Sequence, residues 1–374
     1  GCGEKKTDQE RNRAFERVPE NPGSGAMVRA NPQRTGVYPD SGKLPKGAFL
    51  WHVAEKGLPY MADPVIVGEK IFYGAWFRNT VICCNAADGE LIWKFTTDPG
   101  NEQTMEPPPE LPTPPTVAGE ALFFGTLQGR LYALEAETGN KVWVYQAGDE
   151  ITSSPLVQNG VVYFGCVDGY LYAVDARTGE ELWRYDTGAP VLSFPALDEG
   201  TIFIGSGSID KGYSLLAIDA GKGEELWRFE QAGRYGFTPV VSEGMVYFVS
   251  EDHCVYALDA VTGGLAWKFP TEGYLLHAPA AFDGRIYLGE SNGYVYALDQ
   301  KTGCVIWRVK LEKGVTSSPS IADDLLYISS EDQNLYALDC ETGSEIWRLS
   351  FGMDSAGSPA IVDGLVYFCA GAIQ

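Results

Sequence analysis

Carboxylates, histidines and one pair of adjacent cysteines are the side chains of this sequence that could carry out chemistry. The 374 residues contain 50 Asp and Glu but only three histidines, His52, His253 and His277. Because the histidines stand at scattered positions, a three-histidine metal site is not expected. A carboxylate can act as a general base or a Ca²⁺ ligand, yet none belongs to a recognisable catalytic motif. No Ser-His-Asp spacing or phosphate-binding glycine loop is present either.

A tryptophan repeat sets the elements that position these side chains. Seven times a small residue, alanine or in one copy Cys83, precedes a tryptophan by ten residues. The spacing of about forty residues between copies is typical of a repeat architecture, which overrides any domain count based on length. We expect these tryptophans, with an isolated eighth, to dock structurally between neighbouring units: Trp51, Trp93, Trp143, Trp183, Trp227, Trp267, Trp307 and Trp347.

One repeat, read from residue 154 to residue 185, contains four predicted strands. Two apolar runs flank Asn159-Gly160, a dipeptide typical of a type I′ hairpin turn. A third strand is predicted over residues 170–175, and a fourth over 181–185 follows the tight turn at Thr178-Gly179. Each repeat is therefore a four-stranded antiparallel meander. Such sheets bury both faces when they stack radially around an axis, as in a β-propeller.

The two ends of the chain predict the number of blades. After Trp347 the sequence supplies one more hairpin, over residues 358–368, and residues 48–53 around Trp51 offer an outer strand. We therefore expect an all-β, eight-bladed propeller of four-stranded antiparallel blades over residues 44–374, closed by the N- and C-terminal segments together. The third strand of the closing blade is left open between residues near Ala372 and those near Val37-Tyr38.

The pattern Leu-Tyr-Ala-Leu-Asp-x-x-Thr-Gly-x-x-x-Trp, present over residues 335–347, resembles the tryptophan-docking repeat of the PQQ-type propeller family. The resemblance covers residues 44–374 and implies the fold more specifically than the activity. The family includes quinoprotein alcohol dehydrogenases and non-catalytic periplasmic proteins. Among the latter is the lipoprotein subunit of the outer-membrane β-barrel assembly machinery, which this chain resembles in size, anchor and closure.

The first 43 residues predict a tether. They are polar and rich in Pro and Gly without a strand or helix period. Cys2, followed by a polar stretch, is the expected lipidation site of an exported bacterial lipoprotein; the alternative is an ordinary terminal cysteine. The net charge of −22 argues against nucleic acid and against anionic membrane surfaces as partners. No run of eighteen apolar residues is present to span a bilayer. We expect a periplasm-facing lipoprotein of the bacterial envelope.

The loops that lead into the first and third strands of the blades lie together on one face of the expected disc, where binding is predicted. They carry aromatic residues and an acidic rim. The candidates are Trp76, Phe77, Arg78, Tyr60, Phe194, Tyr235, Phe237, Tyr274, His277, Asp168, Glu251, Asp252, Glu290, Glu331 and Asp332. The alternative is that these are solvated loops of an acidic protein, with Trp76-Phe77 packed under the proline-rich stretch at residues 96–113.

The sequence thus favours a monomeric, non-catalytic binding or scaffold propeller with a protein or peptide partner, and the resemblance suggests outer-membrane protein assembly. No catalytic residue, metal site or cofactor is expected. The alternatives are a dehydrogenase that uses PQQ with Ca²⁺, and a sensor domain for a small ligand. Some dehydrogenases of the family stack their cofactor on a vicinal disulfide. Cys83-Cys84, however, occupies the Ala-Leu positions of a third strand, which favours two small buried residues.

Overall fold

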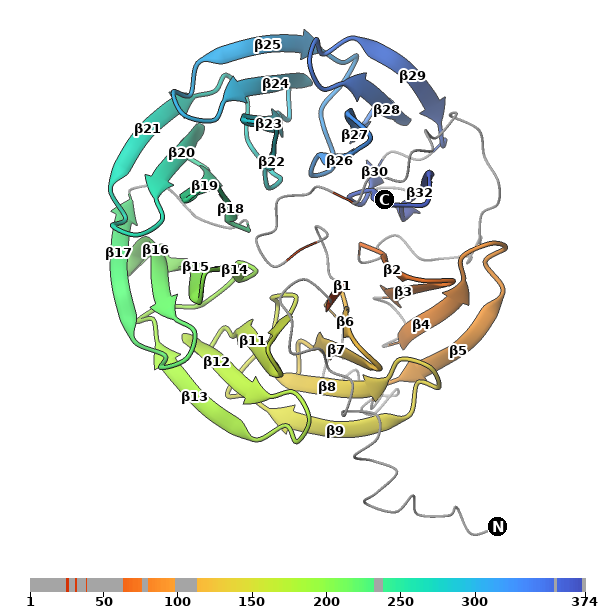
Figure 1. Cartoon of the computed structure of the whole chain (residues 1–374), viewed down its shortest axis with the longest axis vertical. Coiled ribbons are helices and arrows are strands. Elements are labelled where there is room, and N and C mark those ends of the chain that lie inside the picture. Colours follow the sequence, from red (N-terminus) through yellow and green to blue (C-terminus); the bar gives the residue numbers. More distant parts are fainter. Residues whose placement is uncertain are drawn as a thin grey trace.

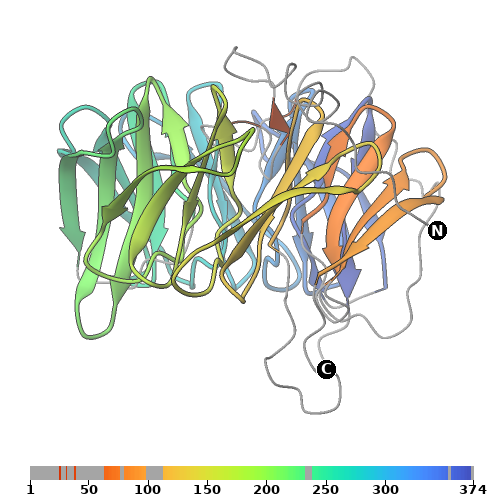
Figure 2. The ribbon, with the colours of Figure 1, turned by 90° about the horizontal axis from the view of Figure 1, so that it is seen from below.

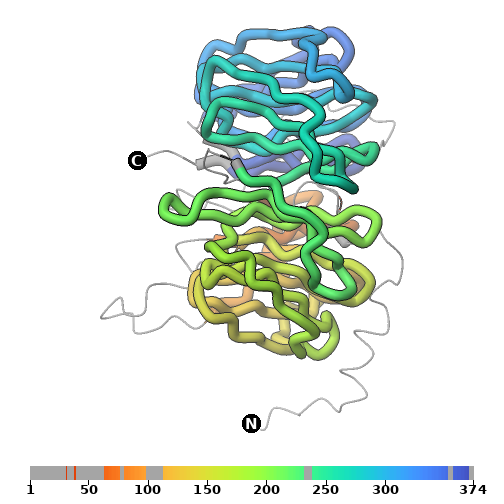
Figure 3. The backbone as a smooth tube through the Cα atoms, turned by 90° about the vertical axis from the view of Figure 1, so that its left-hand side faces the viewer, coloured from red at the N-terminus to blue at the C-terminus, as the bar shows by residue number. Residues whose placement is uncertain are grey.

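A ring of β-sheets arranged around a central axis forms the molecule (Figure 1). The computed structural model describes residues 25–26, 31, 38, 63–75, 80–97, 113–231, 238–352 and 355–371, and every element in them is a strand. Seen from the side, the ring is a disc whose strands run between its two faces (Figure 2), and the backbone trace shows the blades stacked next to one another (Figure 3).

Seven sheets share the predicted four-stranded antiparallel meander. Blade 1 consists of β2 (Val65–Val67), β3 (Lys70–Ala75), β4 (Thr80–Asn85) and β5 (Leu91–Thr96). Blade 2 consists of β6 (Thr116–Ala118), β7 (Ala121–Gly125), β8 (Arg130–Glu135) and β9 (Lys141–Gln146). Blade 3 consists of β10 (Leu156–Gln158), β11 (Val161–Gly165), β12 (Tyr170–Asp175) and β13 (Glu181–Asp186). Blade 4 consists of β14 (Ala196–Asp198), β15 (Thr201–Ser208), β16 (Gly212–Asp219) and β17 (Glu225–Gln231).

The remaining blades follow the same order along the chain. Blade 5 consists of β18 (Val240–Ser242), β19 (Met245–Ser250), β20 (Cys254–Asp259) and β21 (Leu265–Pro270). Blade 6 consists of β22 (Ala280–Phe282), β23 (Arg285–Gly289), β24 (Tyr294–Asp299) and β25 (Val305–Lys310). Blade 7 consists of β26 (Ser320–Ala322), β27 (Leu325–Ser330), β28 (Asn334–Asp339) and β29 (Glu345–Ser350).

The prediction of eight four-stranded blades is wrong, because the structure has seven. Between blades 7 and 1 the described residues form only two strand pairs: the hairpin β31 (Ala360–Val362) with β32 (Leu365–Tyr367), and β30 (Ser355–Ala356) with β33 (Ala370–Gly371). The physical reason is that the chain after β32 pairs with β30 for two residues and does not continue the hairpin as a third strand. The outer strand expected around Trp51 lies outside the described residues.

The hairpin β31–β32 fills the space between the first and last blades. Ala360, Val362 and Tyr367 belong to or pack against a hydrophobic cluster of blade 1, whereas Ile361 and Val366 do so with a cluster of blade 7. The N-terminal extension also returns to the ring. β1 (Gly25–Ala26) adds a fifth strand to blade 2 by pairing with β6. The Tyr38 N–H donates to the Ile321 carbonyl of blade 7 at 2.8 Å, so Tyr38 is not a third strand of the hairpin.

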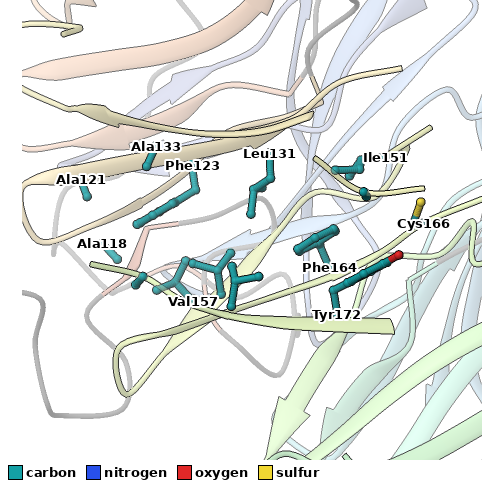
Figure 4. Close-up of a cluster of buried hydrophobic side chains, with 14 residues drawn as sticks. Ala118, Ala121, Phe123, Leu131, Ala133, Ile151, Val157, Phe164, Cys166 and Tyr172 are labelled. Atoms are coloured by element: carbon teal, nitrogen blue, oxygen red, sulfur yellow. The ribbon is translucent and has the colours of Figure 1, made fainter. Parts of the chain in front are cut away.

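The predicted hairpin turn is present in the backbone. Asn159 and Gly160 both have positive φ, 51° and 75°, as a type I′ turn requires. The core lies between blades and not within one sheet. In the cluster between blades 2 and 3, Phe123 and Leu131 from one blade face Phe164 from the other (Figure 4). Each blade thus buries its faces only against its neighbours, as expected for radial stacking.

Each outer-strand tryptophan from blade 1 to blade 6 docks on the turn between the third and fourth strands of the next blade. The Trp183 indole N–H, for example, donates to the Ala220 carbonyl at 3.2 Å, and a Cβ at Gly223 would lie 2.6 Å from the indole ring. The small alanine ten residues earlier does not make the room for the indole. Ala173 pairs with Trp183 within its own sheet, while the room for the indole comes from the turn glycine of the next blade.

Among the residues that the structure describes, blade 7 has no equivalent docking partner. In blade 6 the Tyr287 hydroxyl and the Trp307 indole N–H both donate to one carbonyl of the next blade, that of Cys340. The equivalent donors of blade 7, Tyr327 Oη and Trp347 Nε1, are buried and have no hydrogen-bond partner among the described residues. The seventh interface is therefore built differently from the six before it.

Candidate binding face

One face of the disc carries all the loops that vary between blades, and we call it the loop face. It comprises the connections between second and third strands and the linkers between consecutive blades. The two kinds of loop hold each other in place. The Thr187 N–H in the linker after blade 3 donates to the Gly169 carbonyl at 2.9 Å, and the Gly148 N–H in the preceding linker donates to Asp168 Oδ2 at 3.0 Å. These described loops are therefore held in place by hydrogen bonds within the chain.

Three aspartates of the predicted acidic rim act as hydrogen-bond acceptors within the fold. Asp168, Asp252 and Asp332 occupy the same position in blades 3, 5 and 7, four residues before a tyrosine of the third strand. Each accepts that tyrosine's hydroxyl, with distances of 2.5 Å from Tyr172, 2.5 Å from Tyr256 and 2.6 Å from Tyr336. Burial, together with the neighbouring carboxylate, raises the pKa of Tyr172, so this hydroxyl stays protonated and donates.

Asp252 has a second partner, because Lys268 Nζ lies 2.9 Å from the same carboxylate oxygen. Partial burial alone would raise the pKa of Asp252, but the hydrogen bonds from Tyr256 and Lys268 outweigh burial and lower it. Asp252 therefore stays ionised at neutral pH with both partners belonging to its own blade. A carboxylate held in this way is a poor candidate for a general base.

The three glutamates of the predicted rim differ from one another. Glu290 is fully buried, and its carboxylate accepts the backbone N–H groups of Glu272 and Gly273 at 3.2 and 3.0 Å. Glu251 and Glu331 are exposed at the loop face. Four of the six acidic candidates thus hold loops or tyrosines in place, and two face solvent.

The linkers between blades offer a comparison of equivalent positions. Each of the four described linkers, those after blades 2, 3, 5 and 6, anchors itself with one buried aliphatic side chain, and the next residue is less buried. The buried anchors are Ile151, Val191, Leu275 and Val315. The residues that follow them are Thr152, Leu192, Leu276 and Thr316. Leu192 and Leu276 are 38% and 45% exposed, although two sister linkers fold with threonine there. These leucines are not needed for the fold.

The aromatic and histidine candidates are divided between core and surface. Tyr274 is 55% exposed, and its ring lies against that of His253 with the centroids 4.3 Å apart. Phe194 is half-buried and packs against the cluster shared by blades 1 and 2, and His277 is half-buried. The remaining candidates lie outside the described residues: Cys2, Tyr60, Trp76, Phe77, Arg78, Tyr235 and Phe237.

Three exposed aliphatic residues of the loop face were not among the sequence candidates. Leu192 and Leu276 have been described, and Ile209, 83% exposed, stands at the tip of the lengthened β15–β16 hairpin. An alignment of the linkers with one another would have identified the two leucines, because sister copies carry threonine. No signal in the sequence distinguishes an exposed Ile209 from a buried one.

A PQQ site with Ca²⁺ requires convergent oxygen ligands, and the described part of the chain does not assemble them. It contains no group of three or more His, Cys, Asp or Glu side chains able to hold a metal ion. Cys83 and Cys84 are both buried free thiols, and burial raises the pKa of Cys83 to about 12. Among the same residues, no helix is long and apolar enough to cross a bilayer.

The family model described as outer membrane protein assembly factor BamB matches residues 43–187, 167–278 and 254–372. The comparison with curated proteins gives no match.

Three solved structures show the same fold at low identity. BamB from Moraxella catarrhalis is 19% identical, with 85% of this chain and 93% of that chain covered and a TM-score of 0.65. A europium-containing methanol dehydrogenase is 15% identical, with coverages of 93% and 88% and a TM-score of 0.75. The quinohemoprotein alcohol dehydrogenase ADHIIG from Pseudomonas putida HK5 is 17% identical, with coverages of 98% and 78% and a TM-score of 0.74.

Proposed function

The chain belongs to the family described as outer membrane protein assembly factor BamB, and from this membership we propose that it is a non-catalytic binding propeller of the bacterial cell envelope. Its partner is a protein or peptide, and its process is outer-membrane protein assembly. In this proposal Cys2 is the lipid attachment site, residues 3–43 are a tether, and the propeller faces the periplasm as a monomer.

The observation that carries the proposal is the use of the loop-face carboxylates. Asp168, Asp252 and Asp332 are committed to tyrosine hydroxyls, and Glu290 to backbone N–H groups. A dehydrogenase of this type needs several convergent oxygens for its metal besides a carboxylate base, and the described residues contain no group of three or more His, Cys, Asp or Glu side chains able to hold a metal ion. A binding propeller needs only an ordered face with exposed apolar side chains, as Leu192, Leu276 and Tyr274 supply.

The second candidate is a PQQ-dependent dehydrogenase, which is favoured by the similarity in fold to a methanol dehydrogenase and a quinohemoprotein alcohol dehydrogenase. In that case, residues outside the described ranges, including Trp76 and Arg78, would have to supply the missing contacts to PQQ. The cofactor would provide the oxidising group, and this chain would bind and orient it.

Cofactor binding separates the two candidates. The purified protein is incubated with PQQ and Ca²⁺, and its visible absorbance and thermal unfolding midpoint are recorded against a sample without PQQ. The binding propeller is expected to gain no bound chromophore after desalting and no rise in midpoint. A stoichiometric chromophore with a raised midpoint would overturn the proposal in favour of the dehydrogenase.

The proposed process is tested in the bacterium that carries the gene. Deletion is expected to reduce the folded β-barrel proteins in the outer-membrane fraction, and expression of the full chain is expected to restore them. An unchanged set of outer-membrane proteins in the deletion strain would remove assembly from the proposal. The Cys2→Ser variant is expected to appear in the soluble periplasmic fraction, and continued membrane fractionation would argue against lipidation at Cys2.

A further inference from the structure

We propose that Tyr274 and Leu276, with His253 beneath them, form a docking ridge for a partner segment that carries aliphatic side chains next to a Lys or Arg. The ridge lies on the linker between blades 5 and 6. The inference rests on the proposed binding function and adds to it the place of contact and the chemistry of the partner.

The first observation is that the fold does not require these side chains. Where this linker has Tyr274 and Leu276, the linker between blades 6 and 7 has Gly314 and Thr316 around the same type of buried anchor, Val315. Tyr274 and Leu276 are nevertheless 55% and 45% exposed. Two large apolar side chains held in water at positions that accept glycine and threonine are costly unless something covers them.

The second observation is that the ridge is rigid. The Tyr274 N–H donates to Ser291 Oγ at 3.1 Å, and its carbonyl accepts the Ser291 N–H at 2.9 Å. The preceding Gly273 N–H is held by the buried Glu290 carboxylate, and the following Leu275 is 1% exposed. A preformed backbone reduces the ordering cost of binding, so even a small apolar ridge can contribute to affinity.

The third observation concerns the packing beneath the ring. The His253 ring lies 4.3 Å from that of Tyr274, and one of its nitrogens, Nδ1, is 3.2 Å from the Gly273 carbonyl oxygen. If Nδ1 carries the proton, it donates to that carbonyl and fixes the imidazole plane. The imidazole covers one side of the tyrosine and leaves the exposed side for a partner.

The fourth observation gives the sign of the partner's charge. The chain places its own cations over tyrosine rings beside carboxylates: Lys268 lies 4.7 Å from the Tyr256 centroid and 2.9 Å from Asp252. Arg308 lies 4.6 Å from the Tyr294 centroid and 3.1 Å from Glu272. No described cation lies over Tyr274, which is 55% exposed. With a net charge of −22, this surface favours a cationic partner.

Site-specific photocrosslinking in the source bacterium tests the ridge. A benzophenone amino acid replaces Leu276 in one strain, Thr316 in a second strain and Leu226 in the control strain. Leu226 is 53% exposed but lies on an outer strand, away from the loop face. Crosslinked peptides are identified by mass spectrometry. We expect an adduct at position 276 but not at 226, to a peptide that contains aliphatic residues and at least one Lys or Arg. An adduct to a peptide without a cation, or no adduct at 276, would overturn the proposal.

A binding measurement on the identified peptide completes the test. The double variant Tyr274→Gly/Leu276→Thr, which copies the sister linker, is expected to bind the synthetic peptide about tenfold more weakly than the parent protein. Its unfolding midpoint should be unchanged. Unchanged affinity would overturn the proposal. An adduct at position 316 without one at 276 would show that the loop face binds a partner elsewhere, so the proposed function would stand while the ridge fails.

Discussion

The outer strands and the loop face of this propeller both expose leucines, but for different reasons. On the outer strands the exposed aliphatic residue stands immediately before the tryptophan, where the sheet register shifts by one residue. It recurs in blades 1, 3, 4, 6 and 7 as Ile92, Leu182, Leu226, Ile306 and Ile346. On the loop face, Leu192 and Leu276 replace threonine in two of the four linkers that the structure describes. An exposed aliphatic residue that recurs in most blades is a feature of the fold, whereas exposed leucines found in a few linkers point to a partner.

Where outer-strand residues differ between blades, the neighbouring blade carries a side chain that bonds to them. Tyr145 of blade 2 donates its hydroxyl to Glu181 of blade 3, and Tyr185 of blade 3 donates to Glu225 of blade 4 at 2.6 Å. On the linker, Tyr274 packs on the His253 ring, but neither Tyr274 nor Leu276 recurs, because the next linker has Gly314 and Thr316 at these positions. A difference between copies is therefore informative when no neighbouring blade compensates for it.

The largest effect is expected where the repeat is strictest. Trp267 is 9% exposed, packs against Gly303 and donates to the Gln300 carbonyl at 3.0 Å. Trp267→Ala should lower the free energy of unfolding by about 3–5 kcal/mol, because it leaves a cavity between two blades. Urea unfolding followed by circular dichroism measures this loss, with Leu226→Ala as the exposed control. Equal losses for the two variants would contradict the interblade role of the tryptophan.

A smaller effect is expected at the aspartates of the loop face. Asp252→Asn should lower the free energy of unfolding by about 1 kcal/mol at pH 7, because the charge-assisted bonds from Tyr256 and Lys268 are weakened. The pKa of Asp252 is lowered in the folded state, so its contribution is present above the unfolded-state value of about 3.9 and is lost as the pH falls through the folded-state value. Urea unfolding from pH 7 to pH 3 should show the two proteins converging below about pH 4. A difference in the free energy of unfolding that grows as the pH falls would contradict this prediction.

The seventh blade allows the indole hydrogen bond to be isolated. Trp347 Nε1 has no acceptor among the described residues, whereas Trp307 Nε1 donates to the Cys340 carbonyl at 3.0 Å. Replacement by phenylalanine should therefore cost about 1 kcal/mol more at position 307 than at position 347. Thermal unfolding of the two variants, measured in parallel, checks this. Equal costs would mean that Trp347 has an acceptor after all.

The smallest effect on stability is expected at the exposed leucine of the linker. Leu276→Thr should change the free energy of unfolding by no more than about 0.5 kcal/mol, because threonine already occupies the equivalent positions 152 and 316. Chemical denaturation of the variant and the parent protein provides the test. A loss above about 2 kcal/mol would place Leu276 in the core and remove it from the binding face.

The repeated part of the fold could be predicted from the sequence, since its determinants are local. Asn159-Gly160 specifies a turn, and the Ala-to-Trp spacing specifies paired third and fourth strands. The number of blades could not be predicted, because Tyr367 and the residues after it pair according to what closes the ring, which is a long-range choice. The aspartates were correctly placed in the loops, but their tyrosine partners became visible only in three dimensions. Leu276 was missed because the sequence was searched for residues that recur from blade to blade, and Leu276 does not recur in the linker between blades 6 and 7.

One measurement tests most directly the claim that function lies in unrepeated loop-face residues. Two double variants are expressed in a deletion strain of the source bacterium: Leu192→Thr/Leu276→Thr on the loop face, and Leu182→Thr/Leu226→Thr on the outer strands. Folded β-barrel proteins in the outer membrane are then quantified at equal levels of each variant. We expect the loop-face double variant to fail to restore the folded β-barrel proteins and the outer-strand double variant to restore them fully. Full restoration by the loop-face pair would contradict the claim.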